Sequence, residues 1–147
     1  MIKVDIRKAF DSLQWDFVAN MFSGFGFPKQ FTDWVLGCIQ SPWYSLKLNG
    51  ELSGFFQGNS GIRQGDPLSP YLFLLSMEVL SRYLRKHCDQ PLVSYHPKCS
   101  RLNLNHLIFD DDLMIFTRRD VPSVEAVKLI LNQFAGLYGL HANTAMS

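Results

Sequence analysis

Three consecutive aspartates, Asp110 to Asp112, interrupt a run of large apolar residues in the segment HLIFDDDLMIF at 106–116. Apolar runs of this length predict short buried strands, whereas adjacent carboxylates repel one another and lose hydration when they are buried. Both demands are met if two short strands fold back on each other and the aspartates form the turn between them. The triplet is then either a solvated turn or a site where a bound cation compensates the charge.

A second aspartate lies in a similar setting. Asp5 is part of IKVDI at 2–6, which also predicts a buried strand. If the strands at 2–6 and 105–117 are neighbours in one sheet, Asp5 and Asp111 face each other at one edge. Carboxylates held together in this way favour hard divalent cations such as Mg²⁺, which take oxygen ligands and keep water for substrate phosphates. Two such ions about 4 Å apart would suit in-line phosphoryl transfer, and a solvated aspartate turn is the alternative.

The rest of the pattern places long helices between short strands. Apolar residues recur at helical spacing in four segments, around 15–22 and at 29–39, 66–86 and 123–138. Asn49-Gly50 stands between two alternating apolar runs, which is typical of a tight β-hairpin. Asp66 is expected to cap the third helix, with Pro67 as its first residue. This order of elements predicts a sheet that is covered by helices on one face.

The composition favours one folded domain. Hydrophobic residues make up 47% of the 147 residues and aromatic residues 14%, which excludes a disordered chain. The net charge of +1 neither favours nor excludes a nucleic-acid partner, but basic residues are grouped locally, as at Arg82, Arg85 and Lys86. The longest apolar run, at 71–75, is too short to span a bilayer, so no membrane partner is expected.

The cysteines give little support to a metal framework. Cys38, Cys88 and Cys99 are far apart and form no CxxC pair, which is typical of reduced, intracellular thiols. A zinc site could be assembled from Cys88, His96, Cys99 and His106, although this spacing matches no common zinc pattern. A zinc-stabilised interaction module therefore stays as a weaker alternative.

Three longer motifs occur in order along the chain: KVDIRKAFD at 3–11, SGIRQGDPLSPYLF at 60–73 and FDDD at 109–112. In this order and at these spacings they resemble motifs A, B and C of the palm of reverse transcriptases. The likeness is greatest to the polymerases of plant non-long-terminal-repeat (LINE-type) retrotransposons, and NGELSGFF at 49–56 and MEVLSRYL at 77–84 support it. The resemblance covers essentially the whole chain. It implies an α+β polymerase palm, an antiparallel sheet with helices packed on one face.

The resemblance assigns roles to individual positions. The catalytic and metal-binding carboxylates, which would hold two Mg²⁺ ions or Mn²⁺ in their place, match Asp5, Asp111 and Asp112. Phe10 matches an aromatic residue that excludes a ribose 2′-hydroxyl, and the alternative for Phe10 is an ordinary core aromatic. Gln64 and Gly65 match a pair that contacts the incoming nucleotide and the template, where glycine permits close backbone approach.

The implied reaction is the template-directed addition of dNTPs to a primer 3′-hydroxyl, with an RNA template, a DNA primer and dNTPs as partners. Residues 1–147 then form a partial reverse transcriptase domain with palm motifs A, B and C and the approach to motif D, and the fingers and thumb would come from a longer chain. Two positions depart from the family: Asp110 replaces a small or apolar residue, and Met146 replaces a lysine. These departures favour the alternative, an inert retrotransposon-derived fragment that at most binds nucleic acid or protein.

Overall fold

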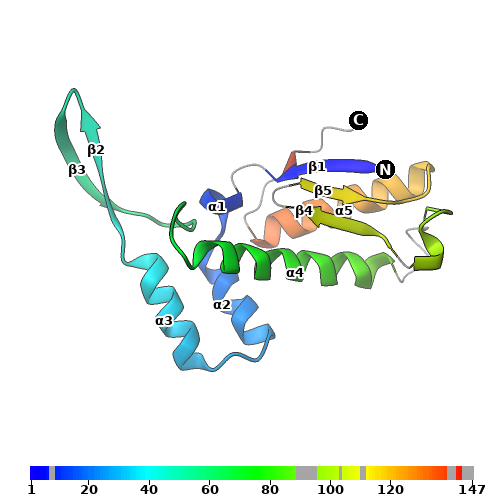
Figure 1. The fold of residues 1–147 in the computed structure, drawn as a ribbon, viewed down its shortest axis with the longest axis horizontal. Coiled ribbons are helices and arrows are strands. Elements are labelled where there is room, and N and C mark those ends of the chain that lie inside the picture. The colour runs from blue at the N-terminus through cyan, green and yellow to red at the C-terminus, as the bar shows by residue number, and fades with distance from the viewer. Residues whose placement is uncertain (7–8, 89–95, 103, 110–111, 139–141, 144–147) are drawn as a thin grey trace.

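The structure is a computed structural model of residues 1–147 (Figure 1), and it describes all of them except 7–8, 89–95, 103, 110–111, 139–141 and 144–147. At a few further positions, including Asp5 and Cys88, only the backbone is described. The elements in chain order are β1 (Ile2–Ile6), α1 (Ala9–Ser12), α2 (Trp15–Gly24), α3 (Lys29–Gln40), β2 (Trp43–Leu48), β3 (Glu51–Gln57), α4 (Ser69–Cys88), the 3-10 helix η1 (Ser100–Leu102), β4 (His106–Phe109), β5 (Asp112–Ile115), α5 (Val121–Tyr138) and β6 (Ala142–Asn143).

The central sheet has the strand order β4-β5-β1-β6, and each pair of neighbours is antiparallel. Val4 of β1 lies opposite Leu113 of β5, which in turn lies opposite Ile108 of β4. The first strand of the chain therefore sits between the β4–β5 hairpin and the short strand β6. This confirms that the strands near 2–6, 105–110 and 112–117 are neighbours in one sheet.

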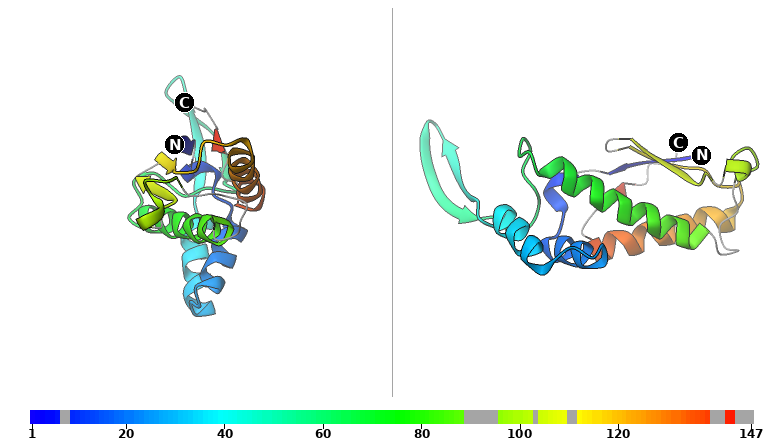
Figure 2. Two further views of the ribbon diagram at one scale, coloured as in Figure 1. Left: turned by 90° about the vertical axis from the view of Figure 1, so that its right-hand side faces the viewer. Right: turned by 60° about the horizontal axis from the view of Figure 1, so that its bottom comes forward.

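The two faces of this sheet differ in character. Alternate side chains point toward the helices, and those of Ile2, Val4, Ile6, Leu113 and Ile115 are buried. Lys3, Leu107 and Phe109 on the other face are exposed. Helices α4 and α5 cover the apolar face in each view, whereas the opposite face is free of helices (Figures 1 and 2). The α+β fold with an antiparallel sheet and helices on one face is thus confirmed.

Three helices complete the core beneath the sheet. Each contributes side chains that recur at helical spacing and are buried: Phe17, Val18, Met21 and Phe22 from α2; Leu72, Met77, Leu80 and Leu84 from α4; and Val127, Ile130, Leu131 and Phe134 from α5. Burying a large aliphatic or aromatic side chain contributes about 1.5–3 kcal/mol, so this cluster holds the helices against the sheet. In the described part of the chain, no helix has the length and apolarity needed to cross a lipid bilayer.

The β2–β3 hairpin projects away from the sheet and the helices (Figure 1). Its turn is the predicted Asn49-Gly50 pair, with φ of 51° and 92°, and two consecutive positive φ values are typical of a type I′ turn. Most of the large side chains on the two strands are exposed: Trp43, Tyr44, Leu46, Leu48, Leu52, Phe55 and Phe56. The predicted hairpin is confirmed, but it contributes little to the core.

Two helix starts differ from the sequence prediction. Helix α4 begins at Ser69, and the predicted first residue Pro67 lies in a preceding turn. Asp66 does act as a local acceptor, because the Leu68 N–H donates to its Oδ1 at 2.9 Å. Helix α5 begins at Val121 rather than Ser123, since Asp120 ahead of it accepts the Ser123 N–H at 2.9 Å. Short polar caps thus fix both starts within a few residues of the prediction.

Candidate functional site

The sheet brings two of the predicted carboxylate residues to adjacent positions. The Cα atom of Asp5 on β1 is paired with that of Asp112 on β5, and Phe109 on β4 is the next partner in the same line. We call the cross-strand positions Phe109, Asp112 and Asp5 the aspartate row. Asp112 is the first residue of β5 rather than part of the turn, because its backbone already pairs with both neighbours.

The remaining members of the predicted set lie outside the described residues. This applies to Asp110, Asp111 and Met146 as a whole, and to the side chain of Asp5. The predicted approach of Asp5 to Asp111 therefore stays a prediction. Among the side chains that the structure describes, no group of three His, Cys, Asp or Glu residues is placed to hold a metal ion.

The carboxylate of Asp112 already binds a positive charge. The Lys3 Nζ lies 2.8 Å from Asp112 Oδ2, and both side chains are about half exposed on the helix-free face. The two residues are diagonal neighbours, because Lys3 itself is paired with Met114. An ammonium group bound here shows that the Asp112 carboxylate attracts a cation, and carboxylate oxygens are the ligands that a hard divalent cation prefers. Sequence reasoning missed Lys3, although a lysine in a strand of apolar residues was a visible signal.

The second motif is attached to the segment that follows β1. The Ile62 N–H donates to the Phe10 carbonyl and the Gly61 N–H to the Leu13 carbonyl, each at 2.7 Å. The indole Nε1 of Trp15 donates back to the Gly61 carbonyl at 2.8 Å. These three hydrogen bonds fix the loop before α4 against α1 and the start of α2. Two segments that are separated by about fifty residues in sequence therefore form one unit.

Gly61 can be no other residue without distortion. Its φ is +86°, and an added Cβ would lie 2.7 Å from the backbone oxygen of Asp11. Gly65 also has a positive φ, +85°, but the space around it is open. Gln64 and Gly65 lie in an exposed turn. The sequence motif points to Gln64 and Gly65 but not to Gly61, because the constraint on Gly61 depends on a contact with a distant segment.

Between this loop and the β2–β3 hairpin lies an open groove of about 540 Å³. Its lining includes Asp11, Tyr44, Phe56, Arg63 and Gln64. The aromatic rings of Tyr44 and Phe56 stack with their centroids 5.9 Å apart. The groove thus combines a flat aromatic wall, a guanidinium group and exposed backbone beside the second motif.

Phe10 has a packing role. It is partly buried and stacks on Phe73 of α4, with ring centroids 5.1 Å apart and planes inclined by 22°. This contact fits the alternative reading of Phe10 as a core aromatic, and it also holds the ring in one place. Its predicted contact with a nucleotide stays a prediction.

A buried polar cluster lies between β4 and α4. The His106 Nε2 is 2.8 Å from the Ser81 Oγ, and its Nδ1 is hydrogen-bonded to the Asn105 Oδ1. Burial lowers the pKa of His106, nearby Arg85 lowers it further, and Glu78 opposes the shift. Because both ring nitrogens are engaged, His106 is unsuited to the zinc site that the cysteine spacing left open.

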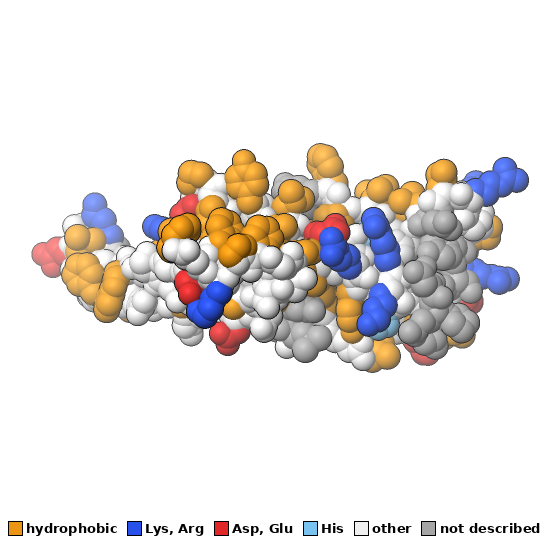
Figure 3. All heavy atoms as spheres, turned by 90° about the horizontal axis from the view of Figure 1, so that it is seen from below, with side chains coloured by type: hydrophobic (Ala, Val, Ile, Leu, Met, Phe, Trp, Pro, Cys, Tyr) orange, Lys and Arg blue, Asp and Glu red, His pale blue; other side chains and the backbone are white. Residues whose placement is uncertain are grey.

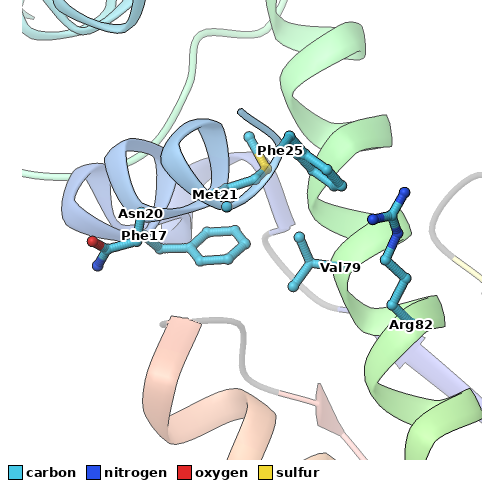
Figure 4. Close-up of a pocket in the computed structure, with 7 residues that line it drawn as sticks. Phe17, Asn20, Met21, Phe25, Val79 and Arg82 are labelled. Carbon is cyan, nitrogen blue, oxygen red and sulfur yellow. The ribbon is translucent and has the colours of Figure 1, made fainter. Parts of the chain in front are cut away.

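A small pocket between α2 and α4 is mainly apolar, and the described residues around it lack the reactive groups of a catalytic or metal site (Figure 4). It has a volume of about 230 Å³, and its lining is mainly apolar, with Phe17, Met21, Phe25 and Val79. Arg82 lies at the rim, where its guanidinium carbon is 4.7 Å from the centre of the Phe25 ring. The described residues that line this pocket include no carboxylate, imidazole or thiol.

Basic side chains gather over the C-terminal half of α4 (Figure 3). Arg82, Arg85 and Lys86 are exposed there, and Arg82 Nε donates to Glu78 Oε1 at 2.9 Å. Cations in the last turns of a helix stabilise the negative end of its dipole. This grouping therefore has a local structural explanation, and α4 lies on the face of the sheet opposite to Lys3.

Comparison with known proteins identifies the arrangement. The family model described as "Reverse transcriptase (RNA-dependent DNA polymerase)" matches residues 1–145. The chain belongs to the reverse transcriptase family. The Pol polyprotein of the R2 retrotransposable element from Popillia japonica is 30% identical over 121 residues, 82% of this chain, and its counterpart from Drosophila melanogaster is 35% identical over 113 residues, 77% of this chain. The expected likeness to non-long-terminal-repeat retrotransposons is thereby confirmed.

Solved structures show the same reverse transcriptase fold. Telomerase from Candida tropicalis in complex with a telomeric RNA fragment superposes with a TM-score of 0.71 at 16% identity and covers 97% of this chain.

An uncharacterized mitochondrial protein of Arabidopsis thaliana is 44% identical over 66 residues, 44% of this chain and 54% of that protein. The plant origin stays a prediction. The chain spans 19% and 10% of the two R2 polyproteins and 24% of the telomerase chain.

The close contact between Gly61 and Asp11 predicts that alanine substitution at Gly61 destabilises the chain more than alanine substitution at Gly65 does. Gly61→Ala and Gly65→Ala both place a Cβ at a positive φ, but only the first meets the Asp11 carbonyl. We expect Gly61→Ala to lower the free energy of unfolding by about 1–3 kcal/mol more than Gly65→Ala, the usual range for overpacking. Urea unfolding of both variants measures the difference. Equal losses would contradict the tight contact with α1.

The buried imidazole predicts a pH dependence of stability. Because the pKa of His106 is lowered in the folded chain, the unfolded chain binds a proton more readily. Stability is therefore retained above the usual histidine pKa of about 6.5 and is lost as the pH falls below it. Urea unfolding at neutral and mildly acidic pH should show this loss in the wild type and in the control His96→Gln, which changes a histidine that is only partly buried. The loss should shrink in His106→Gln, and an unchanged loss there would contradict the assignment to His106.

Proposed function

We propose that this chain is the palm of an RNA-directed DNA polymerase of retrotransposon origin, acting by two-metal nucleotidyl transfer. The observation that carries the proposal is the register of the sheet, which pairs Asp5 with Asp112 at the end of the β4–β5 hairpin. Both residues belong to motifs that resemble those of the family, and the Asp112 side chain lies on the helix-free face. Such a face is open to a primer-template duplex.

The proposed metal ligands are Asp5, Asp111 and Asp112. Held by these residues, two Mg²⁺ ions, or Mn²⁺ in their place, would lower the pKa of the primer 3′-hydroxyl and compensate the charge of the leaving pyrophosphate. The contribution of this chain is positional. The pairing of β1 with β5 sets the separation of two carboxylate-bearing residues, and buried side chains on the opposite face keep that pairing in one register.

The proposed nucleotide and template contacts come from the second motif. Gln64 and Gly65 lie in an exposed turn whose base is hydrogen-bonded to the segment after β1, so a nucleotide could reach that backbone without displacing it. Phe10, held against Phe73, would present a rigid wall to the sugar. The RNA template, DNA primer and dNTPs are proposed partners on these grounds. Positioning of this kind supplies much of the rate in phosphoryl transfer.

Residues 1–147 are proposed to form a palm that works together with fingers and thumb from a longer chain. The second candidate function is an inert fragment of such an enzyme. Asp110 and Met146 favour this candidate, because an added carboxylate repels primer phosphates and a lost lysine no longer assists the leaving group. The two candidates differ in activity and can be separated by experiment.

The first test is metal binding. Calorimetric titration with Mn²⁺ should give weak binding to the wild-type chain, because Mg²⁺-type ions rely on substrate phosphates for several ligands. Asp111→Asn should weaken this binding further. Asp33→Asn, which removes a carboxylate paired with Lys29 on α3, is the matched control and should leave the isotherm unchanged. Identical isotherms for the wild type and Asp111→Asn would reduce the aspartates to a solvated turn.

The second test is primer extension on an RNA template. The isolated chain should give no measurable product, since a palm alone cannot hold primer, template and triphosphate together. A chimera that carries the fingers and thumb of a relative should extend the primer, and Asp110→Ala should raise its activity more than Met146→Lys does. Asp111→Asn in the same chimera is the blank. A chimera no more active than this blank would favour the inert fragment, and extension by the isolated chain would show that fingers and thumb are dispensable.

A further inference from the structure

Lys3 and Asp112 lie far apart in the sequence and meet on the helix-free face of the sheet. The distance from Lys3 Nζ to Asp112 Oδ2 is 2.8 Å, and the side chains are 51% and 38% exposed. Lys3 lies one position along β1 from buried Val4, and Asp112 one position along β5 from buried Leu113. The strands that carry the pair are thus fixed, while the charged groups themselves remain in contact with solvent.

This ion pair differs from the others between described residues. Those join residues within four positions of each other and stabilise a local turn of helix or loop: Lys29 with Asp33, Arg63 with Asp66, Arg82 with Glu78, and Arg118 with Asp120. The Lys3–Asp112 pair instead connects two strands at the aspartate row. Exposed pairs contribute little to stability, so the fold does not depend on it.

The chemistry of the pair sets it in competition with a metal ion. A carboxylate oxygen that accepts a hydrogen bond from an ammonium group is not free to coordinate a cation. The ammonium charge also repels a second cation nearby, and this repulsion is stronger beside protein than in bulk water. A cation that binds Asp112 must therefore displace Lys3 or share the carboxylate with it.

We propose that Lys3 is a built-in counter-cation of the aspartate row. It holds the Asp112 carboxylate in place before a divalent cation arrives, and it releases that carboxylate when the cation binds. Lys3 is then a positioning residue, since it acts through Asp112. The inference rests on the proposed function in one respect, namely that Asp112 is a ligand.

The test is a double-mutant cycle read by Mn²⁺ calorimetry on the full chain. Lys3→Gln removes the charge with little loss of side-chain length, and it should bind Mn²⁺ about three- to tenfold more tightly than the wild type. In an Asp112→Asn background the same change should alter the affinity by less than about twofold, because the Asp112 carboxylate for which Lys3 competes with the cation is gone. Lys3→Arg keeps the charge and should retain the weak wild-type affinity.

Lys47→Gln on β2 is the matched control, because it removes an exposed lysine of the projecting hairpin and should leave Mn²⁺ affinity unchanged. Urea unfolding should give Lys3→Gln a stability close to that of the wild type, since the pair is exposed. If the two stabilities are close, a change in Mn²⁺ affinity cannot be attributed to unfolding of the Lys3→Gln variant.

The outcomes separate this inference from the proposed function. The inference is overturned if Lys3→Gln binds Mn²⁺ no more tightly than the wild type does. It is also overturned if Lys3→Gln increases Mn²⁺ affinity by the same factor in the Asp112→Asn background, because the effect would then not depend on Asp112. Binding that appears only in Lys3→Gln supports it. If neither chain binds Mn²⁺, the inference and the proposed metal site both fall. If Asp111→Asn matches the wild type while Lys3→Gln binds more tightly, only the proposed metal set is overturned.

Discussion

The antiparallel pairing of β1 with β5 is the constraint on which the other features depend. Val4 and Leu113 face each other in this pair and are fully buried, and Ile2 and Ile115 continue the same apolar line. A shift of one residue would turn Lys3 toward the helices and expose the apolar residues. Such a shift is costly, because burying an unpaired charge is far less favourable than burying an aliphatic side chain. The hydrophobic face thus determines where the charged residues meet.

The second motif is placed by a different kind of force. Backbone hydrogen bonds from Gly61 and Ile62, and the indole of Trp15, attach the loop before α4 to the segment that follows β1. The attachment is possible because Gly61 has no side chain where the Asp11 carbonyl approaches. Apolar burial therefore sets the separation of the strands, and hydrogen bonding between backbones sets the position of the loop. Together they hold the first and second motifs in one arrangement.

The sequence predicts those elements whose pattern is local. The strand at 2–6, the Asn49-Gly50 hairpin and the amphipathic helices follow from apolar spacing and turn chemistry, and the structure confirms them. The resemblance of three motifs to the reverse transcriptase palm supplied the candidate site, and spacing alone left a solvated turn as an equal alternative. Features that depend on distant segments were missed: the strand β6, the tight approach at Gly61 and the partnership of Lys3 with Asp112. In each case the residue or strand in contact is distant in the sequence. Apolar periodicity reports only on local structure, so it cannot predict such contacts.

The β2–β3 hairpin has a practical consequence for work with the chain. Among the described strands, β2 and β3 pair only with each other, so their outer edges have no strand partner there. The two strands carry a single lysine and a single glutamate, Lys47 and Glu51. Natural edge strands are protected from pairing with other copies by charges, prolines or covering segments, and little of that protection is present here. Because its aromatic and aliphatic groups are exposed, we expect this hairpin to associate with other copies as the protein concentration rises. The highest concentration at which the isolated chain stays monomeric is thus expected to depend on the β2–β3 hairpin, which takes no part in the aspartate row.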